Sequence, residues 1–125
     1  MTDKDRPLPV DGSLLLSMDF RAIAQELREH PSYEKNLKNA RSLVRGSEFS
    51  LTLVALQAGA KLKEHHAPAP ASATVLEGEI EFLCVTEQKS FRLSTLQAIA
   101  FSPETAHSVT ATKETLLLLT FGQRS

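Results

Sequence analysis

The chain has 125 residues, a formal net charge of -1 at pH 7 and 42% hydrophobic residues. This length suits one domain and is too short for two ordinary ones, and the composition is that of a globular protein rather than a disordered one. The balance of charges excludes the basic excess with which proteins bind nucleic acid or anionic membranes. We therefore expect a single domain that has neither nucleic acid nor a membrane among its partners.

Residues 1–18 are polar or proline-bearing for most of their length and predict an N-terminal arm, whereas residues 19–125 predict the single domain. From Asp19 onward apolar residues recur at helical spacing, at Phe20, Ile23, Ala24 and Leu27. Asp19 suits the N-cap of this short amphipathic helix, and His30 with Pro31 suits its end, where a histidine cation is mildly favoured. Because short isolated helices are marginal in water, we expect the helix to pack on the outside of the domain or on a second subunit.

After Asn39 apolar and polar residues alternate, which is typical of short β-strands. The expected strands cover residues 41–45, 48–57, 62–66, 72–77, 79–85, 89–93, 96–101, 107–111 and 115–121. No helical pattern interrupts them, so a parallel fold with crossover helices is disfavoured. The sequence therefore predicts an all-β barrel or double-sheet sandwich with a short N-terminal helix.

Cys84 is the only cysteine, so an internal disulfide is excluded, which fits a reducing compartment. Its expected place is that of a small buried apolar residue. The chain shows no apolar stretch of signal-peptide length near Met1 and no run of the roughly 20 apolar residues that a membrane-spanning helix needs. We expect a cytoplasmic protein.

Three histidines, His65, His66 and His107, lie on or beside the expected strands. Over about residues 39–122 the sequence resembles the cupin superfamily: Gly59, His65 and Gly78 stand at the separations of the family's first motif. His107 stands at the histidine of the second motif. The resemblance implies the cupin-type double-stranded β-helix, also called a jelly-roll barrel.

The chain departs from the family at the other motif positions. Ala67 replaces the second histidine of the first motif and Ala71 replaces its glutamate. In the second motif the positions of both glycines, the proline and the asparagine hold Leu96, Glu104, Ser102 and Ala111.

In cupins three histidines and a glutamate hold a divalent iron, manganese, nickel, zinc or copper ion inside the barrel. By this resemblance His65 and His107 are the candidate metal ligands, but two neutral imidazoles are fewer than the three protein ligands of a usual catalytic site. Adjacent strand residues point to opposite faces, so His66 would join them only if the strand is bulged. No cofactor is therefore certain, and a divalent metal would be held loosely.

The histidines also allow two other interpretations. They can be polar residues in the mouth of the barrel, bonded to each other, to Glu64 or Glu104, or to water. Alternatively, the small side chains of Ala67 and Ala71 leave room beside His65 and His107 for a small, partly apolar ligand.

We expect first a cupin-type protein that binds a small molecule, or a loosely held divalent metal, inside its barrel. The alternative is a metal-dependent enzyme of the dioxygenase, isomerase or decarboxylase type found among similar cupins. A third hypothesis is a structural or interaction protein. Under each of them we expect a homodimer, because a small barrel has strand edges and an apolar helix face to cover.

Overall fold

A computed structural model of the protein describes residues 15–46, 48–66 and 70–122, with the backbone alone for residues 64–66. Most of the predicted arm lies outside the described residues, so its boundary at residue 18 stays a prediction. The helices and strands, in chain order, are α1 Phe20–Glu29, α2 Pro31–Asn36, β1 Lys38–Arg45, β2 Ser50–Leu56, β3 Lys61–His66, β4 Ala71–Glu77, β5 Glu79–Cys84, β6 Lys89–Ser94, β7 Ala98–Phe101, β8 Ala106–Ala111 and β9 Thr115–Phe121.

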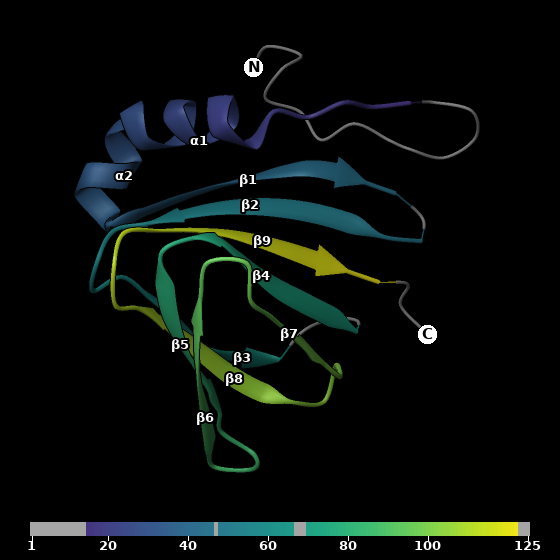
Figure 1. The fold of residues 1–125 in the computed structure, drawn as a ribbon. Coiled ribbons are helices and arrows are strands. Elements are labelled where there is room, and N and C mark those ends of the chain that lie inside the picture. Colours follow the sequence, from purple (N-terminus) through teal and green to yellow (C-terminus); the bar gives the residue numbers. More distant parts are fainter. Residues whose placement is uncertain (1–14, 47, 67–69, 123–125) are drawn as a thin grey trace.

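The strands form two antiparallel sheets that face each other (Figure 1). The first sheet has the strand order β1-β2-β9-β4-β7 and the second has the order β3-β8-β5-β6. Since neighbours within each sheet are often distant in sequence, the chain passes repeatedly from one sheet to the other. The prediction of an all-β, two-sheet barrel with a short N-terminal helix is confirmed.

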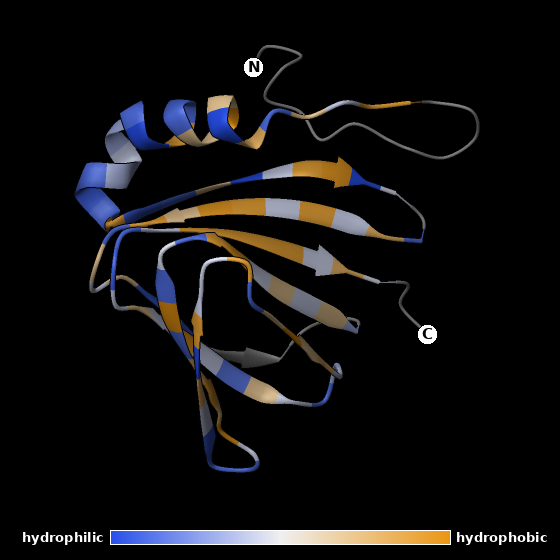
Figure 2. Ribbon diagram, viewed as in Figure 1, coloured by the Kyte–Doolittle hydropathy of each residue, from blue (hydrophilic) through white to orange (hydrophobic). Residues whose placement is uncertain are grey.

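Two apolar cores lie on opposite faces of the first sheet. In β2, Val54 and Leu56 belong to the core between the sheets, whereas Leu53 and Ala55 belong to the core beneath the helices. The strand is partly exposed at its start and buried on both faces at its end, as its sequence predicts. Figure 2 shows the resulting hydrophobic stripes along the strands of this sheet.

Helix α1 covers the outer face of the first sheet (Figure 1). The Asp19 carboxylate accepts hydrogen bonds from the backbone N–H groups of Arg21 and Ala22, at 3.0 and 3.1 Å, and so caps the helix as predicted. Ala24 and Leu27 are buried against the sheet. The helix thus packs on the outside of the barrel. Within the part of the chain that the structure describes, neither helix has the length and apolar character that crossing a membrane would need.

The predicted end of the first helix at His30 and Pro31 is confirmed, since α1 ends at Glu29 with His30 as its C-cap. A second helix, which the sequence analysis did not predict, begins directly at Pro31. Pro31 occupies the first turn of α2, where its missing N–H group costs no helical hydrogen bond. Nδ1 of His30 accepts a hydrogen bond from the Ser32 N–H at 3.1 Å, a contact that a doubly protonated ring could not make. His30 is therefore both the C-cap of α1 and the N-cap of α2.

A polar cluster joins the helices to the end of β4 and to the turn between β8 and β9. The Tyr33 hydroxyl donates to a Glu114 carboxylate oxygen at 3.2 Å, and the Arg28 guanidinium lies 3.9 Å from Glu77 and 4.0 Å from Glu114. Burial raises the pKa of Tyr33 above its usual value of 10.0, and the negative charge and hydrogen bond of Glu114 raise it further.

Tyr33 is the only tyrosine and the chain has no tryptophan, so alkaline titration followed by phenolate absorbance reports this group alone. We expect a midpoint above 10.0 in the folded protein and a lower midpoint in Glu114→Gln. Because the folded pKa is the higher one, the contribution to stability is complete below pH 10.0 and is lost as the pH rises through the folded pKa. Glu34→Gln, on the same helix, is the control. A midpoint at or below 10.0 in the unmodified protein would contradict the assigned contact.

Candidate ligand site

His107 lies in β8 with its side chain inside the barrel, and only 3% of the residue is exposed. Its ring stacks on Phe82, with centroids 5.2 Å apart and an interplanar angle of 10°. The ring of Phe101 packs on it at a tilt, with centroids 4.4 Å apart. The imidazole is therefore held in one orientation by aromatic neighbours from both sheets.

The backbone that precedes β8 fixes the proton on this ring. Nδ1 of His107 lies 3.1 Å from the carbonyl oxygen of Thr105, and a carbonyl oxygen can only accept. Nδ1 therefore carries hydrogen, and in the neutral ring the lone pair is on Nε2. The Thr105 carbonyl is itself placed by a turn, in which Thr105 N–H donates to the Ser102 carbonyl at 3.2 Å. The same arrangement, with a backbone carbonyl behind the imidazole, orients histidines that bind ligands or metals.

The strand register brings His65 next to His107. His65 is the partner of His107 across the β3–β8 ladder, and Cys84 is the partner of His107 on the other side, in β5. Residues directly opposite each other share one face of an antiparallel sheet, so the register places His65 on the inner face. The side chains of His65 and His66 lie outside the described residues.

Strand β3 does contain an irregularity, but not between the two histidines. The register shifts between Leu62 and His65, after which His65 and His66 pair with successive residues of β8, His107 and Ala106. With regular pairing, neighbouring residues alternate between faces, so the register places His66 on the face opposite His65. The irregularity of β3 thus precedes both histidines, and a contribution of His66 to the same ion stays a prediction.

The structure describes only one of the two alanines of the predicted pocket. Ala67 lies outside the described residues. Ala71 begins β4, is buried, and pairs with Phe101 of β7 and Phe121 of β9. Aromatic residues thus flank the position where the family has its glutamate.

The cavity beside His107 is small, with a volume of about 30 Å³. It is lined, among the described residues, by Leu62, Ala73, Phe82, Phe101, His107, Val109, Leu119 and Phe121. A space of this size holds about one water molecule. Whether His65, His107, Ala67 and Ala71 line a ligand pocket therefore stays a prediction, and a larger molecule needs additional space.

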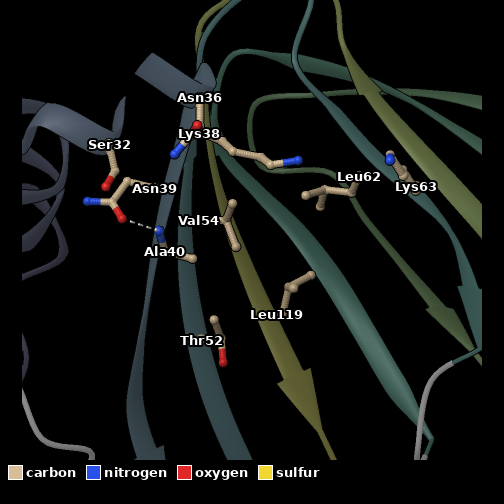
Figure 3. Close-up of a pocket in the computed structure, with 10 residues that line it drawn as sticks. All are labelled: Ser32, Asn36, Lys38, Asn39, Ala40, Thr52, Val54, Leu62, Lys63 and Leu119. Atoms are coloured by element: carbon tan, nitrogen blue, oxygen red, sulfur yellow. Dashed lines mark hydrogen bonds between the residues drawn. The ribbon is translucent and has the colours of Figure 1, made fainter. Parts of the chain in front are cut away.

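That space lies in a groove of about 680 Å³ on one side of the barrel. The groove opens between the β1 edge of the first sheet and the β3 edge of the second, and Figure 3 shows its lining. It is lined by Ser32, Asn36, Lys38, Asn39, Ala40, Thr52, Val54, Leu62, Lys63 and Leu119. Leu62 and Leu119 also line the small cavity, so the groove and the cavity beside His107 are neighbours that share these two side chains.

Across the described side chains, no group of three or more histidine, cysteine, aspartate or glutamate residues could hold an ion. His107 is the one predicted metal ligand among these side chains. A second ligand from His65 stays a prediction, and two imidazoles would fit at most a loosely held ion.

No protein-family model and no curated protein matches the chain. Many solved structures do match. A conserved protein of unknown function from Streptococcus pyogenes is 22% identical, with a TM-score of 0.69 over 93% of this chain and 92% of that one. A cupin superfamily protein from Desulfitobacterium hafniense is 13% identical, with a TM-score of 0.69 over 94% and 96%.

An RmlC-like cupin from Desulfovibrio desulfuricans is 20% identical, with a TM-score of 0.66 over 77% of this chain and 92% of the other. Likenesses at these identities show the fold and leave the ligand open.

Proposed function

We propose that this chain, which has the cupin fold, binds a small molecule between its two sheets, with the imidazole of His107 as the polar contact at the inner end. One observation carries the proposal: Leu62 and Leu119 form walls of both the open groove and the cavity beside His107. In this proposal, a molecule in the groove reaches the buried ring by displacing these two side chains, without crossing a strand.

The burial of Leu119 supports this path. Leu119 lies on β9, the middle strand of the first sheet, and packs against the core between the sheets, yet it is only partly buried. An inward-facing leucine on a middle strand is ordinarily fully covered. Its exposure is explained by the separation of the sheets on the β1 and β3 side, where the groove opens.

The aromatic rings of Phe82 and Phe101 hold the imidazole in place, and the Thr105 carbonyl holds its Nδ1 proton. Because the ring is already held in place, little side-chain entropy would be lost when a ligand contacts the imidazole. A mostly apolar pocket with a few fixed polar groups is the usual form of a small-molecule site.

A loosely held iron, manganese, nickel, zinc or copper ion between His65 and His107 is the second form of this proposal. It is supported by the pairing of the two histidines across β3 and β8. The enzyme alternative, a dioxygenase, isomerase or decarboxylase, would need at least one metal ligand in addition to these two histidines. The expected homodimer stays a prediction.

The test is a fragment screen on the whole chain, followed by NMR of the imidazole signals. We expect bound fragments to shift the ring signals of His107 and to lose affinity about tenfold or more in His107→Gln, which removes the oriented imidazole. His30→Gln, outside the barrel, is the control. Fragments that bind equally well to His107→Gln would refute the proposal, and elemental analysis showing one tightly held metal ion per chain would favour the enzyme alternative.

A further inference from the structure

We infer that the groove takes an organic acid, a molecule with an apolar body and one carboxylate, and that Lys38 and Lys63 hold the carboxylate at the rim. This inference rests on the proposed function for the path to His107, and it adds the chemical class of the ligand.

The charge of the lining is one-sided. Lys38 and Lys63 are cationic, and the remaining polar residues of the lining, Ser32, Asn36, Asn39 and Thr52, are neutral. No described residue that lines the groove is acidic. Such a lining attracts anions and repels amines.

The ammonium group of Lys38 is held at the mouth of the groove. Its Nζ donates to the backbone carbonyl of Lys61 at 2.8 Å, so the side chain reaches from the edge of the first sheet to the edge of the second. This contact uses one of the three N–H donors of an ammonium group. Figure 3 shows the Lys38 and Lys63 side chains at the same end of the groove. Since an ammonium group has three N–H donors, a carboxylate between Lys38 and Lys63 can accept charge-assisted hydrogen bonds beside the contacts that each lysine already makes.

The floor of the groove is apolar. Leu62 lies between the two lysines, and Ala40, Val54 and Leu119 line the groove below them (Figure 3). A volume of about 680 Å³ is within the range of small-molecule pockets. The site therefore offers charge at one end and apolar contact over the rest, which matches a monocarboxylate with an aliphatic or aromatic body.

Calorimetry with three molecules that share one apolar body tests the inference: octanoate, octanol and octylamine. We expect octanoate to bind the unmodified chain about tenfold or more tightly than octanol, and octylamine to bind most weakly. Lys38→Met with Lys63→Met keeps the apolar stems and removes both charges, so the preference for octanoate should disappear. Lys35→Met with Lys89→Met removes the same charge from exposed sites outside the groove and should preserve the preference.

A fourth variant locates the binding. Ala40 is an exposed residue of β1 that lines the groove, so Ala40→Trp should fill the space without disturbing the core and abolish octanoate binding. Equal affinities for octanoate and octanol, an unchanged preference in the double lysine variant, or octanoate binding to Ala40→Trp would each overturn the inference. If fragments shift the His107 signals but show no preference for acids, the inference fails and the proposed function stands. If acids bind preferentially but do not affect His107, the inference stands and the proposed contact with His107 fails.

Discussion

Replacing Gly78 by alanine is expected to cost about 3 kcal/mol or more of folding stability. Gly78 forms the turn between β4 and β5 with φ at +100°, a conformation that L side chains rarely adopt. An added Cβ would lie 2.3 Å from the Glu114 carbonyl oxygen and 2.5 Å from Oγ1 of Thr115. Neither atom can move aside easily, because one is backbone and the other accepts the Glu79 N–H and donates to the Lys113 carbonyl.

Gly59→Ala is the matched control for Gly78→Ala. Gly59 has a similar φ of +91°, but nothing lies within 4 Å of the position of an added Cβ. This variant should lose only the backbone cost, about 1 kcal/mol. Urea denaturation followed by circular dichroism measures both free energies of unfolding. Equal losses of folding stability in the two variants would show that the close approach of Glu114 and Thr115 adds nothing to the cost of Gly78→Ala.

The strands were predictable because alternation of apolar and polar residues is a local signal. The predicted strand ends were less accurate, because backbone geometry determines where a strand begins and ends. The strand expected at 96–101 begins at Ala98, since Leu96 adopts a positive φ of 69° in a turn. That turn is closed by a hydrogen bond from the Gln97 N–H to the Ser94 carbonyl. Leucine is not a residue type that indicates a positive φ, so the alternating pattern predicts a strand at residues that lie in the turn.

The cupin resemblance directs attention to His65 and His107, and the register shows that they are partners across the β3–β8 ladder. That their side chains share one cavity stays a prediction. The groove could not be expected, because its lining combines β1, β2 and β9 of one sheet with β3 of the other. Lys38 and Lys63 line the same groove only because the edges of the two sheets lie near each other, which is a non-local property. The resemblance also drew attention to missing ligands at Ala67 and Ala71 rather than to the walls that Leu62 and Leu119 provide.

Phe82→Ala is expected to cost about 3–5 kcal/mol, the range for truncating a fully buried phenylalanine. Phe82 is 1% exposed and packs against both His107 and Phe101, with ring centroids 5.2 Å apart in each pair. Phe91→Ala is the control, since Phe91 is the partner of Phe82 across the β5–β6 ladder but is 41% exposed. This control should lose about 1 kcal/mol. Thermal and urea denaturation measure both, and a loss in Phe82→Ala no larger than in Phe91→Ala would contradict the assignment of Phe82 to the centre of the barrel.

The same variant tests what limits the space beside His107. Removing the Phe82 ring should enlarge the water-sized cavity into an apolar space, because a packed core closes only partly around a deletion. Benzene should then bind to Phe82→Ala and raise its melting temperature, while the unmodified chain shows no rise, since a ligand stabilises only a state that it binds. If benzene stabilises both proteins equally, the ring of Phe82 does not set the size of the cavity. In that case the buried imidazole is already reachable by an aromatic ligand.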